Sequence, residues 1–236
     1  MWNFLLAIAS IGPADLLILE ASDREAEALL AAALPTWTLR CVAIPKRRVS
    51  KVMRLVQILR NGPPSGLAKL DFEAAETSIG QIAQDRRLIV AIQPIAAVLA
   101  LRVHPESCAV LVDLWDIEDA RLARLSAARD GDSASRSPRR AWDNIRDKSD
   151  IRAWRRFHEQ LVTDSDAVTV CSDVDRHAMP SSTKIYVVPN GADRRDDAPR
   201  PLHQPPVILY HGQMTYAPNA DAARILVEEI LSLIHI

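Results

Sequence analysis

The sequence predicts an α/β fold built on a doubly wound parallel sheet. Short apolar runs alternate with longer stretches of helical periodicity, as in "CAVLVDLW" over 108–115 and "AVTVC" over 167–171. The runs are continuously apolar rather than alternating, which is typical of strands covered by helices on both faces. The 236 residues, of which 48% are apolar and 25% charged, suffice for a buried core.

Six strands are expected, each bounded by polar or turn-forming residues. They are 15–19, 38–44, 87–93, 108–115, 167–171 and 184–188. After the first strand, Ser22 or Asp23 can cap a helix that ends at Pro35. The segment 48–62 predicts a helix that stops at Asn61-Gly62. Its apolar face consists of Val52, Leu55, Val56 and Leu59.

Two segments interrupt this alternation. The polar, low-complexity stretch 128–140 predicts a mobile loop. The stretch 193–206 places four prolines among charges and predicts an interdomain linker. The expected organisation is therefore a domain over 1–192, a linker over 193–206 and the beginning of a second domain over 207–236. That last part reads as a strand at 207–210, a Gly turn and a helix capped by Asn219.

Composition narrows the function classes. The net charge is −1 and the pI about 6.6, so the overall charge gives no case for nucleic-acid binding. No apolar run approaches the ~20 residues that span a bilayer. The odd number of cysteines, each in an apolar strand-like run, favours buried thiols in a reducing compartment over disulfides. They are Cys41, Cys108 and Cys171. We expect a cytoplasmic protein, since the apolar opening lacks the basic start of a signal peptide.

The second half of the chain carries a family resemblance. In order, it contains "WRRFHEQLVTDSDAVTVCSDVD", "KIYVVPNGAD", the Pro-rich linker and "VILYHGQMTYAPNADAARIL". This order resembles GT-B-fold glycosyltransferases of the family 4 type, and more narrowly bacterial exopolysaccharide-type sugar transferases. The stretch "VLVDLWDIEDARLARL" is also similar to that family. The resemblance covers most of the chain and is most specific over 154–229.

The resemblance implies two Rossmann-like domains with the active site in the cleft between them. The first domain, here lacking its first strand, would hold the acceptor. Residues 207–236 would supply only the first βα unit of the domain that binds the nucleotide-sugar. The full protein would transfer a sugar from a nucleotide-sugar to a saccharide or lipid-linked acceptor in polysaccharide and cell-envelope glycan synthesis. It would retain anomeric configuration and need no metal or other cofactor, and a truncated chain is expected to be inactive.

A second reading remains open, in which the chain is a stand-alone Rossmann-like binding or interaction module without catalysis. A complete module of that kind should carry its own first strand and Gly-rich phosphate loop, and the sequence shows neither. The sequence does not specify the sugar, the nucleotide or the acceptor.

The acceptor-side candidates follow strand ends, where doubly wound sheets bind ligands. Asp113, Asp116 and Glu118 end or follow the strand 108–115, and either contact an acceptor or act as acids at a helix N-terminus. Ser172 follows the strand 167–171, where capping the next helix is the favoured role.

The donor-side candidates come from the resemblance, which puts two turns at the nucleotide-sugar side of the cleft. They are Asn190, Gly191, Gly212, Gln213 and Met214. No catalytic residue is assigned, because no histidine has an acid nearby in the sequence in an arrangement that identifies a general base.

Three D-x-D pairs fit loop, helix-end and capping positions better than metal ligands, so no metal site is expected. They are Asp130/Asp132, Asp164/Asp166 and Asp173/Asp175. The basic segment 136–156 is interleaved with acids and predicts a solvated helix with i,i+4 pairs. The alternative for this segment is peripheral contact with anionic headgroups at the inner membrane face.

Overall fold

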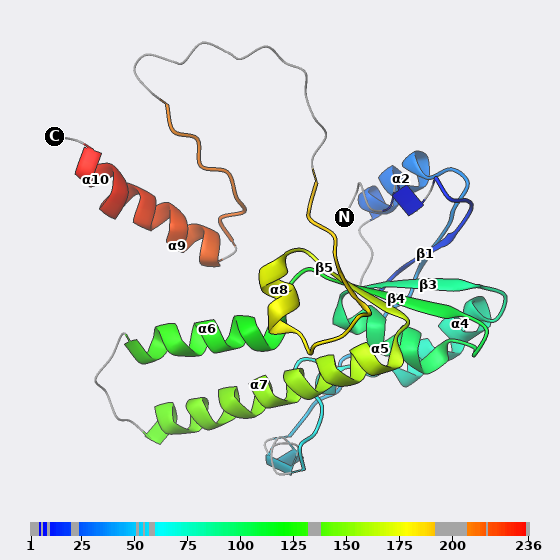
Figure 1. Cartoon of the computed structure of the whole chain (residues 1–236), viewed down its shortest axis with the longest axis horizontal. Helices are drawn as coiled ribbons and strands as arrows, with labels where there is room; N and C mark the ends of the chain where they lie inside the picture. The colour runs from blue at the N-terminus through cyan, green and yellow to red at the C-terminus, as the bar shows by residue number, and fades with distance from the viewer. Residues whose placement is uncertain are drawn as a thin grey trace. The chain divides into compact units, whose positions relative to one another are not determined.

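The computed structural model describes residues 5, 7, 8, 10–19, 24–50, 52, 53, 55, 56, 60–131, 138–191, 207–215 and 217–234. The chain divides into two compact units, Met1–Ala192 and Asp193–Ile236 (Figure 1). The predicted linker 193–206 lies outside the described residues.

The first unit contains two parallel sheets, which confirms the α/β prediction. In one sheet β1 pairs with β2, and in the other the strand order is β3-β4-β5-β6, with every pairing parallel. All six strands form within the bounds that the sequence predicts. They are β1 Asp15–Ile18, β2 Thr38–Cys41, β3 Leu88–Ile92, β4 Ala109–Leu114, β5 Ala167–Val170 and β6 Ile185–Val187.

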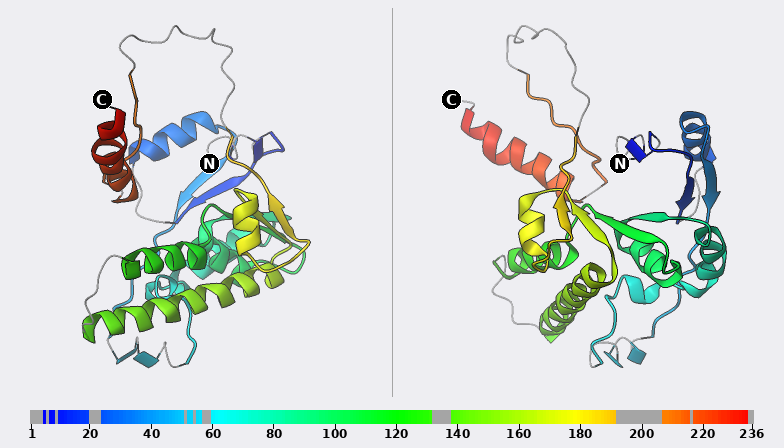
Figure 2. Two further views of the ribbon diagram at one scale, coloured as in Figure 1. Left: turned by 60° about the vertical axis from the view of Figure 1, so that its left-hand side comes forward. Right: turned by 45° about the vertical axis from the view of Figure 1, so that its right-hand side comes forward.

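Helices connect these strands. They are α2 Arg24–Ala33, the short η1 Leu67–Lys69, α4 Glu73–Ala83, α5 Gln93–Val103, α6 Glu118–Gly131, α7 Pro138–Asp164 and α8 Asp173–Ala178. The predicted loop 128–140 is wrong at both ends, because α6 runs to Gly131 and α7 starts at Pro138. Pro138 suits the start of α7, because proline is favoured in the first turn of a helix. Within the segment 128–140, residues 132–137 lie outside the described residues. Helices α6 and α7 lie side by side (Figures 1 and 2).

The main core lies on the β3–β6 sheet. Val110, Val112 and Leu114 of β4 are completely buried, as are Val168 and Val170 of β5. They pack with Ala97 and Ala100 of α5 and with Leu161 and Val162 of α7. In β4 the intervening Leu111 and Asp113 are only half-buried, so the two faces of this strand are covered unequally. The expectation of full cover on both faces therefore holds only in part.

A second cluster joins α4, α5 and α7 and extends to the β1–β2 sheet. Its buried members include Phe72, Ile79, Leu99 and Trp154. Leu17 of β1 is among the partly buried residues that pack against them. Helices α5 and α7 contribute residues to both clusters, although β1 and β3 form no backbone ladder within the part of the chain that the structure describes.

The described part of the second unit contains a helical stretch over residues 217–234. Helix α9 (Ala217–Ile225) continues through a π-helical turn, η2 (Leu226–Ile230), into α10 (Leu231–Ile234). Residues 207–215 contain no strand, so the strand predicted at 207–210 is wrong. An isolated extended segment has no neighbour for its backbone groups, and Val207 and Leu209 are 72% and 87% exposed. The predicted cap at Asn219 is also wrong, because the helix begins at Ala217 with Pro218 in its first turn.

The cysteines differ from the expectation of uniform burial. Cys108 is buried, Cys171 is partly exposed and Cys41 is exposed. Cys41 ends β2, which pairs only with β1 among the described strands. Over the described ranges, no helix is both long and apolar enough to cross a membrane.

Candidate functional site

The carboxyl ends of β4, β5 and β6 meet at one edge of the sheet, because these strands are parallel neighbours. The residues there are Asp113, Asp116, Cys171, Ser172 and Asn190, which we call the carboxyl edge. The Cys171 thiol lies 3.9 Å from the carbonyl oxygen of Leu114 and 3.8 Å from Oδ1 of Asn190. Side chains that follow three different strands therefore converge, as ligand sites in open α/β sheets do.

Asp113 is held in a fixed orientation. The Thr169 hydroxyl donates to its Oδ1 over 2.6 Å, and the indole Nε1 of Trp115 donates to its Oδ2 over 2.8 Å. Thr169 faces Asp113 in the strand register and is itself buried. Each carboxylate oxygen keeps an acceptor site, so the group can receive further hydrogen bonds from a hydroxyl-bearing ligand.

The Cys171 thiol is not an activated nucleophile. Burial raises its pKa above the ordinary 9.0, and the nearby Asp113, Asp175 and Asp116 carboxylates raise it further against the smaller lowering effect of Asn190. A thiol in such surroundings stays protonated at neutral pH, whereas nucleophilic cysteines have a depressed pKa.

Ser172 caps α8, as the sequence predicts. Its hydroxyl oxygen accepts from the backbone N–H of Asp175 at 3.1 Å and its O–H donates to Asp175 Oδ2 at 2.6 Å. The reciprocal use of both residues resembles a capping box. The Ser172 hydroxyl is thus engaged within the helix start.

The predicted acids after β4 separate into two groups. Asp116 is exposed, and its charge reaches the Cys171 thiol. Glu118 turns instead to Arg121 in the first turn of α6, with Oε2 lying 2.6 Å from Nη2. The structure therefore brings Asp113 and Asp116 to the carboxyl edge, while Glu118 serves its own helix.

Gln93 is a residue that sequence reasoning missed. It follows β3 directly, and its predecessor Ile92 pairs with Asp113 in the register, so Gln93 adjoins the same edge. Its φ is 75°, which is rare for a residue with a long side chain and costs backbone energy. The only signal in the sequence was a polar residue placed between an apolar strand and Pro94.

A buried His–Asp pair was also missed. Nδ1 of His158 in α7 lies 2.9 Å from Oδ1 of Asp119 in the first turn of α6. His158 is 1% exposed and Asp119 5% exposed. Asp119 Oδ2 lies 3.6 Å from Nε of Arg155. The pair fixes α7 against the helix that leaves the carboxyl edge, and its 39-residue separation hid it from the sequence.

The donor-side candidates fall in different units. In the first unit Asn190 approaches Cys171, and the neighbouring Gly191 lies in open space. In the second unit Gly212, Gln213 and Met214 precede α9. The Asn219 side chain donates to the carbonyl of Gln213 over 3.2 Å. A Cβ on Gly212 would come within 2.9 Å of Asn219 Nδ2, so a larger residue at this turn would displace the Asn219 side chain.

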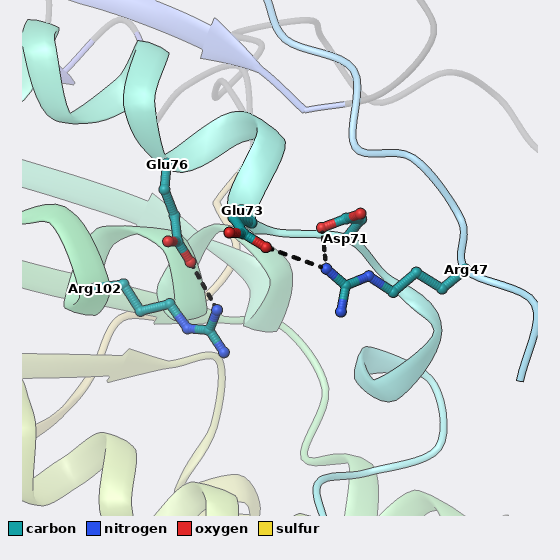
Figure 3. Close-up of polar contacts among 5 residues, drawn as sticks. All are labelled: Arg47, Asp71, Glu73, Glu76 and Arg102. Atoms are coloured by element: carbon teal, nitrogen blue, oxygen red, sulfur yellow. Dashed lines mark hydrogen bonds and ion pairs between the residues drawn. The ribbon is translucent and has the colours of Figure 1, made fainter. Parts of the chain in front are cut away.

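A cleft of about 620 Å³ lies elsewhere on the first unit. Figure 3 shows the charges around it: Arg47 with Asp71 (2.6 Å) and Glu73 (3.6 Å), and Arg102 with Glu76 (2.7 Å). The hydrogen bond from Arg47 lowers the pKa of Asp71. Arg102 lies near the end of α5, whose chain continues to the amino end of β4, so the cleft is remote from the carboxyl edge. Its charges already pair with one another.

Two residues of the D-x-D pairs have structural partners. Asp166 Oδ2 accepts from the backbone N–H of Val110 at 2.7 Å, and Asp175 completes the α8 cap. Among the residues with described positions, no group of three or more His, Cys, Asp or Glu side chains is arranged to hold a metal ion. No protein-family model matches this chain, and no curated protein matches it either.

Proposed function

We propose that this chain is the acceptor-side part of a GT-B-type glycosyltransferase, together with the beginning of its nucleotide-sugar domain. The observation that carries the proposal is the Asp113 carboxylate, oriented by Thr169 and Trp115, at the same sheet edge as the Asn190 amide that contacts Cys171. Fixed carboxylate and amide groups at a sheet edge suit the many hydroxyl groups of a sugar. The acceptor in this proposal is a saccharide or a lipid-linked glycan of the cell envelope.

The strand order supports a doubly wound domain of this type. The described strands run β2-β1 in one sheet and β3-β4-β5-β6 in the other, all parallel. One further parallel strand between β1 and β3 would give a single seven-stranded sheet with the order 3-2-1-4-5-6-7, which begins with the 3-2-1-4-5-6 order of dinucleotide-binding folds. Helices α5 and α7, which contribute to the apolar clusters on both sheets, and the ion pair between Asp15 and Arg86 favour that arrangement.

The donor role is proposed for the turn Gly212–Met214. It precedes α9, and turns before helix N-termini are suited to phosphate groups. In such an enzyme the second domain stabilises the leaving diphosphate.

Saccharide binding tests the proposal. Saturation-transfer NMR with common hexoses and their disaccharides should detect weak binding to the whole chain. Asp113→Asn and Thr169→Val should each weaken it by about tenfold, the value of one charged hydrogen bond. Glu159→Gln removes an exposed acid from α7 and should leave binding unchanged. Absence of saccharide binding, or equal binding by all three variants, would contradict the acceptor site.

A further inference from the structure

Residues 46–62, which we call the basic loop, have an unusual charge. No Asp or Glu occurs anywhere from Lys46 to Leu70, although the whole chain has a net charge of −1. The same stretch holds seven cations. They are Lys46, Arg47, Arg48, Lys51, Arg54, Arg60 and Lys69. Lys51 and Arg54 lie outside the described residues, so only their charge is considered.

The basic loop is fixed at its first end. Lys46 forms an antiparallel bridge with Leu70, and the Arg47 backbone N–H donates to the carbonyl of Lys69. The Asp71 N–H donates to the carbonyl of Pro45 over 2.8 Å. These bonds hold residues 45–47 against 69–71.

The other end of the loop is fixed on α7. Arg156 Nη2 donates to the carbonyl of Asn61 over 3.1 Å, and Asp150 accepts from both the N–H and the hydroxyl of Ser65. Asn61 has φ 51°, so the predicted stop of the helical segment is confirmed. The loop is therefore a segment whose two ends are anchored to the first unit.

The middle of the loop exposes Val52 and Leu55 of the predicted apolar face together with Met53, while Leu59 of that face lies outside the described residues. Val52 is 73% exposed, Met53 54% and Leu55 42%, although Val56 is partly covered. In a helix that packs on a sheet these side chains would face the core. Here residues 52, 53, 55 and 56 are helical but Val52, Met53 and Leu55 are exposed, and exposed apolar side chains grouped in this way mark an interaction site.

The segment 46–62 carries cations and no acid of its own. Arg47 is paired with Asp71 and Glu73 (Figure 3). Lys46, Arg48 and Arg60 are exposed. Arg156 donates to carbonyl oxygens of the loop and so adds positive charge at its end. The carboxylates that face the loop are Asp71, Glu73 and Asp150, at its anchored base.

We propose that the basic loop docks on an anionic lipid surface. Val52, Met53 and Leu55 would enter the boundary between headgroups and acyl chains, and Arg48 and Arg60 would contact the phosphates. Nucleic acid is the poorer partner, because the loop has no aromatic side chain on which a base could stack. The inference does not depend on the proposed sugar transfer.

This surface differs from the basic segment 136–156. In that segment Arg146 lies between Asp143 (3.5 Å) and Asp147 (3.3 Å), so acids on the same helix offset part of its charge. The basic loop combines exposed aliphatic side chains with cations and has no acid of its own.

Vesicle co-sedimentation of the whole chain tests the proposal. We expect binding to vesicles of phosphatidylglycerol mixed with phosphatidylcholine, weak binding to phosphatidylcholine alone, and weaker binding as salt rises. Removing two cations with Arg48→Gln/Arg60→Gln should weaken binding about 30-fold, and Val52→Ser/Leu55→Ser about tenfold or more. The matched control Arg146→Gln/Arg152→Gln removes the same charge from α7 and should change binding less than about twofold.

Circular dichroism and thermal melting of each variant establish that it is folded, which is expected because every altered side chain is exposed. As a second measurement, vesicles should slow hydrogen exchange in 46–62 and not in 138–156. The proposal is overturned if the control variant loses as much binding as the loop variants. It is also overturned if the loop variants bind vesicles like the unaltered chain, or if the chain binds an RNA oligomer through the loop and ignores vesicles.

Discussion

The imidazole of His158 and the carboxylate of Asp119 form a buried contact between two helices, with Nδ1 and Oδ1 2.9 Å apart. The rings of Trp154 and Phe157 lie 5.8 and 5.9 Å from the His158 ring, which encloses the pair in apolar surface. Nε2 of His158 is buried and has no hydrogen-bond partner among the described residues. Asp119 is therefore the polar partner that His158 has among the described residues, and their contact joins α6 to α7.

Replacing His158 should destabilise the first unit. His158→Ala removes a buried ring and leaves the Asp119 carboxylate without its main partner, which together cost about 3 kcal/mol. Urea unfolding followed by circular dichroism measures the free energy of unfolding. Glu159→Ala alters the next, exposed residue of α7 and should stay within about 0.5 kcal/mol of the unaltered chain. Equal stability of the two variants would show that the pair contributes little.

Acid should weaken the same contact. Burial on its own raises the pKa of Asp119, but the hydrogen bond and charge of His158 and the charge of Arg155 outweigh it, so the pKa falls below the ordinary 3.8. A carboxyl whose pKa is lower in the folded state than in the unfolded state stabilises the fold when the pH is above its unfolded pKa. This stabilisation is lost as the pH falls through its folded pKa.

Unfolding free energies measured from about pH 5 to about pH 2 check this effect. Asp119→Asn cannot titrate, so it should be less stable near neutrality and should lose less stability than the unaltered chain on acidification. Parallel pH profiles for the two proteins would assign the acid sensitivity to other carboxyls.

The features that the sequence predicts correctly have local signals. The continuous apolar runs gave β4 and β5, because a strand buried in a parallel sheet needs no polar face. The Ser172 cap was predictable because the cap, its partner Asp175 and the helix lie within four residues of sequence. Asp113 was found by its place at a strand end, although its partners Thr169 and Trp115 were not.

The features that the sequence missed depend on contacts between distant residues. Asp119 and His158 are brought together only by the packing of α6 on α7, and no local pattern marks either one. The run Val207–Tyr210 has the composition of a strand, yet a strand forms only beside a partner, and the described residues offer it none. The apolar stripe at Val52 and Leu55 was visible in the sequence, but not its exposure.

The Gly212 turn should not tolerate a larger residue. An added Cβ would lie 2.9 Å from Nδ2 and 3.0 Å from Cγ of Asn219, so Gly212→Ala must displace that amide and break its bond to the Gln213 carbonyl. We expect about 1 kcal/mol of local destabilisation, seen as about fivefold faster amide hydrogen exchange in 212–225. Gly212→Ala/Asn219→Ala removes the clash and should exchange no faster than Asn219→Ala alone. Faster exchange in the double variant would assign the effect to the backbone of residue 212.

Gln93 offers a test of strain at the carboxyl edge. Its φ of 75° suits glycine, so Gln93→Gly should relieve strain and raise the free energy of unfolding by about 1 kcal/mol, despite the greater freedom of glycine in the unfolded chain. Gln160 provides the matched control, because it lies inside α7, where Gln160→Gly should lower stability by about 1 kcal/mol. Urea unfolding of both variants gives the comparison. The two variants should change the free energy of unfolding in opposite directions, since of these two positions only 93 has a left-handed backbone. A loss of stability in both variants would show that Gln93 is not strained.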